Sequence, residues 1–206
     1  AANHGDIGSN AVDLSYSSSS STTVGATGAT STAMGSSTTA SGGVSTAIGF
    51  STTASGGVST AMGHSTTASG TASTAMGAGT TASGLASTAM GDLTTASGAT
   101  STAMGHSTTA SGGESTAMGH STTASDYASL TIGQYNSVNS TVTGSATAFN
   151  PANAAFVIGK GTGSSAKSDA FVVYFNGNAT LSGDLTINSD ERLKENIQPL
   201  GSTLDK

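Results

Sequence analysis

The chain has 206 residues, of which 133 are Gly, Ala, Ser or Thr, while charged residues make up 8% and aromatic residues 4%. This composition excludes an ordinary globular enzyme, whose interior is filled with Leu, Ile, Val and Phe and whose sequence is about one quarter charged. A formal net charge of −6 with five Lys and Arg residues also argues against a nucleic-acid partner, because phosphate contacts need several cationic side chains.

The sequence contains no cysteine and two prolines. Disulfides and thiolate metal sites are therefore excluded. Disorder usually combines low hydrophobicity with high net charge and proline, which this chain does not. Its apolar runs, such as 154–158 and 170–175, are far shorter than the ~20 residues that span a bilayer, and no signal peptide is evident. We expect no membrane insertion and no cofactor.

Residues 1–30 predict irregular coils, with a serine run at 17–21 and a partial repeat match at 21–25. From residue 31 to about 135 the pattern STAMG-xxTTASGxx recurs every 14 residues, in seven consecutive units and a degenerate eighth. The position after the first alanine of each unit always holds a large apolar residue. These residues are Met34, Ile48, Met62, Met76, Met90, Met104, Met118 and Ile132.

Each unit contains two short segments, S-T-A-M and T-T-A-S, and each segment is followed by glycine, except that Asp126 replaces the second glycine of the last full unit. Glycine suits corners that need a positive φ, and β-branched Thr between the corners suits strands. Two glycines per unit would cost about 1 kcal/mol each in a helix. The repeat therefore predicts one coil of a parallel β-solenoid per 14 residues.

Strand alternation assigns the faces of each coil. A coil of two strands has a thin interior, so we place Ala33 and Ala40 inside, with Thr32 and Met34 pointing outward. An outward apolar residue in every coil forms a continuous stripe, which soluble monomers rarely leave exposed. We therefore predict that the stripe is a homotrimer interface. The alternative places Met in the interior and Ala outside. A metal site of thioethers alone is disfavoured, since such ligands select soft copper.

Three histidines share the register position just after a corner glycine, namely His64, His106 and His120. Across a trimer each could form a ring of three imidazoles that holds a metal or an anion. The alternative is that they are exposed turn residues, because Phe50, Ala78 and Asp92 occupy the same position in other coils. We expect no metal site, although the sequence leaves ion binding by these rings open.

The adjacent threonines of each unit raise a second class of function, because regular outward hydroxyl and methyl groups on a flat solenoid suit ice binding. Neighbouring residues of a strand point to opposite faces. We therefore expect the column that begins at Thr39 to be exposed and the column that begins at Thr38 to be buried. A plane with two threonines per strand is then not formed.

Residues 136–188 predict a compact terminal β segment. Its strand candidates are 156–158 and 171–175, and Asn176-Gly177 predicts a hairpin turn after the second. From Ser189 to Lys206 the sequence becomes charged. A capping Ser189 or Asp190 and a terminating Pro199 predict a short helix there.

The 14-residue units, with S-T-A-M/I-G followed by A-S-G, resemble the head repeats of YadA-like trimeric autotransporter adhesins over residues 17–135. The resemblance implies a left-handed parallel β-roll, three of which pack around a common axis. It agrees with a Met34 column at an interchain interface. The chain departs from the usual pattern in having Thr where Val is common and Met where Ile is common.

The sequence SDERLKENI at 189–197 resembles the start of the C-terminal intramolecular chaperone domain of phage tail fibres, endosialidase tailspikes and myelin-regulatory-factor-type proteins. That domain helps β-rich chains to trimerise and then removes itself by self-cleavage. The resemblance implies that Ser189 is the nucleophile and Lys194 its general base. We expect the 206-residue chain not to cleave, because 17 residues after Ser189 are fewer than the family's domain. In the alternative, Ser189 is a helix N-cap and Lys194 a solvated charge.

Together these observations predict a homotrimeric extracellular fibre that attaches to a receptor on a host or target cell surface, with a glycan as one candidate. The repeat suits mechanical extension, since each coil contacts only its neighbours. The chaperone resemblance favours a virion tail fibre. The alternatives are a bacterial cell-surface adhesin and an ice-binding solenoid.

Overall fold

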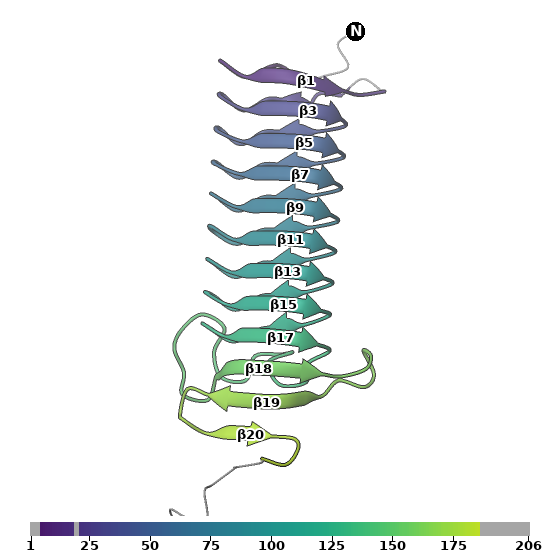
Figure 1. Ribbon diagram of the computed structural model, residues 1–206. Helices are drawn as coiled ribbons and strands as arrows, with labels where there is room; N and C mark the ends of the chain where they lie inside the picture. The colour runs from purple at the N-terminus through teal and green to yellow at the C-terminus, as the bar shows by residue number, and fades with distance from the viewer. Residues whose placement is uncertain (1–4, 19–20, 186–206) are drawn as a thin grey trace, which may run out of the picture.

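A computed structural model describes residues 5–18 and 21–185 of the protein. Over these residues the chain winds into a parallel β-solenoid of about eight turns, which appears as a vertical stack in Figure 1. Each coil consists of a five-residue strand, a corner, a two-residue strand and a second corner. The predicted all-β solenoid is thereby confirmed.

The five-residue strands stack into one sheet, the long-strand sheet, in which Ile48 lies beside Met62 and Ala47 beside Ala61. Every coil is in register with the next because the repeat length never varies. These strands are β1 (Val12–Tyr16), β3 (Thr32–Ser36), β5 (Thr46–Phe50), β7 (Thr60–His64), β9 (Thr74–Ala78), β11 (Thr88–Asp92), β13 (Thr102–His106), β15 (Thr116–His120) and β17 (Leu130–Gln134).

The two-residue strands stack into a second parallel sheet, the short-strand sheet, on the other side of each coil. Its backbone bonds run from coil to coil, as from Thr53 N to Thr66 O at 2.8 Å. These strands are β2 (Gly25–Ala26), β4 (Thr39–Ala40), β6 (Thr53–Ala54), β8 (Thr67–Ala68), β10 (Thr81–Ala82), β12 (Thr95–Ala96), β14 (Thr109–Ala110) and β16 (Thr123–Ala124).

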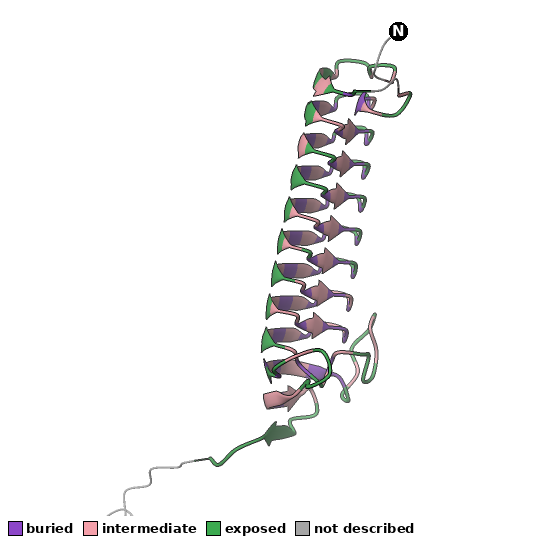
Figure 2. Ribbon diagram, turned by 90° about the vertical axis from the view of Figure 1, so that its right-hand side faces the viewer, coloured by how far each residue is buried: buried purple, intermediate pink, exposed green. Residues whose placement is uncertain are grey.

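Alanine fills the space between the two sheets, which Figure 2 shows as the buried strip inside the stack. Ala33 and Ala40 are fully buried, and so are their equivalents in every coil up to Ala124. The interior is wide enough for methyl groups but not for methionine. The predicted alanine lumen is therefore confirmed, and the alternative with Met inside is wrong.

The threonine columns also separate as predicted, since Thr39 is partly exposed and Thr38 is fully buried. Within the described part of the chain, the hydroxyls of the buried column have no hydrogen-bond partner. This set comprises Thr38, Thr52, Thr66, Thr80, Thr94, Thr108 and Thr122. A buried hydroxyl without a partner loses its bonds to water, so this column costs stability.

Glycine at the corners allows successive coils to stack closely. A Cβ at Gly56 would lie 2.0 Å from the carbonyl oxygen of Gly70, so any side chain there would push the coils apart. At the other corner, Gly63 has a φ of +127° and the same 2.0 Å approach to the oxygen of Gly77. Both corners need glycine, the first for space and the second for space and backbone conformation.

After β17 the chain leaves the repeat and adds three strands to the end of the long-strand sheet. β18 (Ala154–Lys160) continues the parallel stack, whereas β19 (Asp169–Tyr174) and β20 (Ala179–Leu181) pair antiparallel. The hairpin predicted at Asn176-Gly177 is confirmed, with Gly177 at a φ of +87° between β19 and β20. Ala154, Val157 and Val172 form the buried core of this segment.

Residues 1–4, 19–20 and 186–206 lie outside the described residues, and with them the helix expected from Ser189. Across 5–18 and 21–185 the chain forms no helix. That part of the chain accordingly holds no helix long and apolar enough to cross a membrane.

Candidate functional site

Every strand of the long-strand sheet carries one large apolar side chain at the same register position, on the face opposite the alanine lumen. We call this column the apolar stripe. It consists of Leu14, Met34, Ile48, Met62, Met76, Met90, Met104, Met118, Ile132, Ile158, Phe171 and Leu181.

The apolar stripe is open to solvent in a single chain. Leu14 is 64% exposed and Met34 39% exposed, and the methionines after Met34 are partly exposed. The outward orientation predicted for the methionine column is confirmed. The stripe is longer than the sequence predicts, because β1 and the strands after β17 continue it through Leu14, Ile158, Phe171 and Leu181.

A groove lies on the second corner of the coils, where residues 145–147 return against the stack. We call it the corner groove. It has a volume of about 470 Å³. Its lining residues are Ser97, Gly98, Ala99, Thr100, Ser111, Gly113, Glu114, Tyr127 and Thr147.

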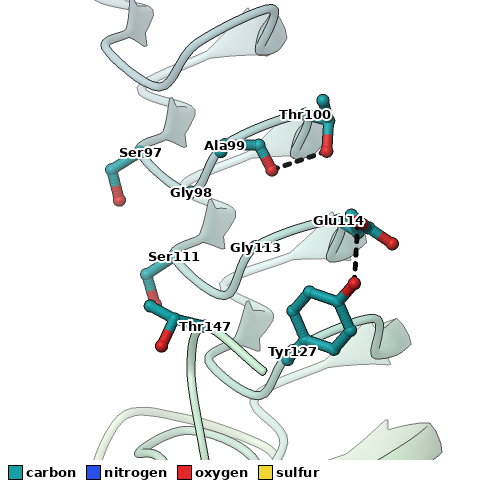
Figure 3. Close-up of a pocket in the computed structure, with 9 residues that line it drawn as sticks. All are labelled: Ser97, Gly98, Ala99, Thr100, Ser111, Gly113, Glu114, Tyr127 and Thr147. Carbon is teal, nitrogen blue, oxygen red and sulfur yellow. Dashed lines mark hydrogen bonds between the residues drawn. The ribbon is translucent and has the colours of Figure 1, made fainter. Parts of the chain in front are cut away.

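The two walls of the corner groove differ in chemistry, as Figure 3 shows. Ser97, Ser111 and Thr147 lie along one side, while Tyr127 and Glu114 lie along the other. The Tyr127 hydroxyl donates a 2.8 Å hydrogen bond to Oε1 of Glu114. That bond raises the pKa of Tyr127 above its ordinary value, and partial desolvation and the negative charge of Glu114 act in the same direction. The tyrosine hydroxyl therefore stays protonated at neutral pH.

Buried Asp126 holds the returning segment in place. Its carboxylate accepts hydrogen bonds from Thr143 N at 2.7 Å, from the Thr143 hydroxyl and from Ala154 N at 2.8 Å. Asp126 occupies the corner position that is glycine in the other full coils. A side chain fits there because the chain departs from the repeat in the next turn, so no coil corner stacks against it. The departure from the repeat pattern is thus what anchors one wall of the groove.

The sequence matches the family described as the YadA head domain repeat. The matches cover residues 26–52, 45–66, 54–80, 82–108 and 110–136, which together span more than half of the chain. The chain belongs to the YadA head repeat family. No curated protein and no solved structure matches it.

Membership in the YadA head repeat family implies an extracellular, surface-exposed protein. The repeats together with the β-solenoid fit an adhesin-like fibre. The matched residues contain most of the apolar stripe and most of the corner groove.

The histidines lie in a ladder along the first corner of this YadA-type solenoid. The ring of His106 stacks on that of His120 with centroids 4.9 Å apart, and His64 stacks on Phe50 at 5.2 Å. His106 Nε2 also lies 3.3 Å from Oδ2 of Asp92, with both side chains about half exposed. Among the described residues of one chain, no three His, Cys, Asp or Glu side chains are grouped to hold a metal ion. Whether copies complete a ring stays a prediction.

Sequence reasoning missed the corner groove. A signal was present, because the corner residues GGE at 112–114 and DYA at 126–128 introduce a charge and an aromatic ring where other coils have GGV or GTA. The position of Thr147 had no comparable signal, since it depends on how the segment after the repeat folds back.

The cleavage residues inferred by resemblance, Ser189 and Lys194, lie outside the described residues. Their roles remain predictions.

Proposed function

We propose that three copies of this chain pack their apolar stripes around a common axis and form an extracellular fibre that attaches to a host or target cell surface. The observation that carries the proposal is the apolar stripe, which is unbroken from β1 to β20. Twelve strands at a spacing of about 4.8 Å make the stripe roughly 50 Å long. An exposed apolar surface of that length is typical of an interface.

Three-fold packing also answers the shortage of core material in a single chain. The lumen of each coil buries only small methyl groups, which contribute little burial energy. Packing the stripes together adds a second core made of methionine, isoleucine, leucine and phenylalanine. Methionine suits such an interface because its flexible side chain adapts to its neighbours.

The test compares two triple variants of the 206-residue chain by analytical ultracentrifugation. Replacing Met62, Met76 and Met90 with Asp places three charges per chain in the interface and should convert the trimer to monomer. The matched control replaces Ser55, Ser69 and Ser83 with Asp, because these residues are exposed beside the short-strand sheet, and it should remain trimeric. A monomeric wild-type protein, or a trimer that persists with the methionines replaced, would contradict the proposal.

Within this class we propose a tail-fibre segment of a phage or other virus. The support is the SDERLKENI sequence at 189–197, which resembles a chaperone domain of tail fibres. In a chain that carries the complete domain, Lys194 would take the hydroxyl proton of Ser189, and the serine oxygen would attack the adjacent peptide carbonyl and break the chain there. Ser189→Ala should abolish this cleavage in such a chain, whereas Ser182→Ala should leave it intact. Cleavage that continues in Ser189→Ala would remove the support for a tail fibre.

A bacterial cell-surface adhesin remains the alternative that shares the same trimeric architecture. The two are distinguished by where antibodies against the solenoid bind, on virions or on intact cells. The ice-binding alternative depends on the Thr39 column, which is a single partly exposed column of threonines. A thermal-hysteresis measurement on the purified protein tests it directly, and we expect none.

A further inference from the structure

We propose that the corner groove binds a neutral saccharide. This inference rests on the proposed function as a surface-attaching fibre and assigns its contact site. All the residues that line the groove come from one chain, so the site does not need a partner copy to be complete.

The first part of the argument is an aromatic wall held in a fixed position. The backbone N–H of Tyr127 donates to Ser145 O at 2.8 Å, and that of Gly113 donates to Ala146 O at 2.7 Å. A Cβ at Gly113 would come within 3.3 Å of Cδ2 of Tyr127, so glycine leaves the space that the ring occupies. A rigidly held ring binds with little loss of side-chain entropy. The C–H groups of a pyranose can pack against such a ring.

The second part is the set of polar groups around that ring. Tyr127 fixes one oxygen of Glu114 through its hydroxyl, and a carboxylate offers about four acceptor positions in all. The remaining positions can accept hydrogen bonds from neighbouring sugar hydroxyls. On the opposite wall, the hydroxyls of Ser97, Ser111 and Thr147 can both donate and accept. A ligand with one C–H face and a rim of hydroxyls matches both walls.

The charge of the groove selects among saccharides. Glu114 carries the single formal charge among the lining residues, and the chain as a whole has a net charge of −6. A sialylated or phosphorylated glycan would bring a second negative charge near this carboxylate, with no lysine or arginine in the lining to offset it. The volume of about 470 Å³ lies within the usual range of small-molecule sites. A neutral sugar is therefore the ligand class we assign.

Weak binding at one groove is compatible with firm attachment of the fibre. If the chain is trimeric, each fibre presents three identical grooves at the same height. Simultaneous binding to several glycans on one surface raises the overall affinity by orders of magnitude without any new contact.

The experiment applies the 206-residue protein to a surface carrying lactose, N-acetyllactosamine, mannotriose and 3′-sialyllactose as separate probes. We expect binding to at least one neutral probe. Tyr127→Ala should lower that signal by about tenfold or more, which corresponds to the loss of roughly 1.4 kcal/mol. Glu114→Gln should lower it several-fold, because it removes the charged acceptor but keeps the size of the side chain.

The matched control is Leu85→Ala, which truncates a large exposed residue at the same corner position three coils before Tyr127. It should bind like the wild type. Tyr127→Phe keeps the ring and tests the site even if Tyr127→Ala perturbs folding, and it should retain part of the signal.

Three outcomes would overturn the assignment. They are a protein that binds none of the neutral probes, binding that survives Tyr127→Ala, and stronger binding to 3′-sialyllactose than to lactose. The oligomeric mass of the same samples separates this inference from the fibre proposal. A trimer that binds no neutral sugar contradicts the groove assignment alone, whereas a monomer that binds one contradicts the trimeric fibre alone.

Discussion

The repeated coils hold their backbone together with other backbone, whereas the region after Gln134 does so with side chains. In a regular coil, Ser111 N donates to the carbonyl oxygen of Ala124 in the next coil at 2.9 Å. One coil later, Ser125 N donates instead to Oδ1 of Asn139 at 2.8 Å. The amide side chain takes the place of a backbone carbonyl where no further coil follows.

Asn136 repeats the substitution on the neighbouring strand, where it accepts a bond from Thr123 N and donates one to Thr123 O, each at 2.8 Å. The edge of the short-strand sheet is thereby satisfied. Open strand edges are templates for pairing with other chains. The comparison shows that a uniform array can be extended by copying one unit, but ending it requires residues found nowhere in that unit.

The first prediction breaks the close stacking that distinguishes the coils from the terminal segment. Gly56→Ala would bring a Cβ to 2.0 Å from Gly70 O, whereas Gly163 has nothing within 4 Å of the same position. We expect Gly56→Ala to lower the unfolding free energy by about 4 kcal/mol or more, and Gly163→Ala to leave it nearly unchanged. Chemical denaturation followed by circular dichroism measures both. Equal stability of the two variants would contradict the stacking argument.

The second prediction restores the repeat pattern at the junction of the two regions. Asp126→Gly makes the last unit match the others but removes the acceptor for Thr143 and Ala154. We expect it to destabilise the protein by about 2–3 kcal/mol, since hydrogen bonds to charged groups are worth that much. Hydrogen exchange should accelerate at Thr143 and Ala154, with the amides of β8 as an internal control. A stabilised variant would show that Asp126 is not an anchor.

The third prediction concerns buried hydroxyls, which have no partner in the coils but are partnered near the terminal segment. Thr66 Oγ1 has no hydrogen-bond partner, whereas Thr131 Oγ1 accepts a 3.2 Å bond from Asn139 Nδ2. Thr66→Val should therefore raise the unfolding free energy by about 1 kcal/mol, and Thr131→Val should lower it by a similar amount. Denaturation midpoints of the two variants check the sign, and a shared sign would contradict it.

The smallest expected effect concerns Tyr127, at the contact between the two regions. Because the bond to Glu114 raises its pKa in the folded protein, this group contributes stability below the pKa of an unfolded tyrosine, near 10. The contribution disappears as the pH rises through the higher folded value. The absorbance difference between wild type and Tyr127→Phe should give a pKa above 10. Glu114→Gln should lower that pKa, and an unchanged value would contradict the role of Glu114.

The sequence predicts the coils well and the terminal segment poorly, for physical reasons. In the coils each residue has the same neighbours as its equivalent 14 positions away, so period and strand alternation suffice to place Ala33 inside and Met34 outside. After the repeat, contacts join residues of unrelated sequence. Neither the role of Asn139 as a substitute carbonyl nor the position of Ile158 and Phe171 in the apolar stripe follows from local pattern. The cost of the unpartnered Thr38 column was equally hidden, since threonine is a good strand residue.

The constant coil length has a consequence for the gene. Adjacent coils share nearly identical codons, so slipped replication or unequal recombination would add or delete whole coils in frame. Such an event would leave the asparagine and aspartate residues that end the array unchanged, and the apolar stripe would gain or lose one residue at its proper register. The molecule could therefore change its reach in steps of roughly 4.8 Å, and inheritable length variation would need no new interface.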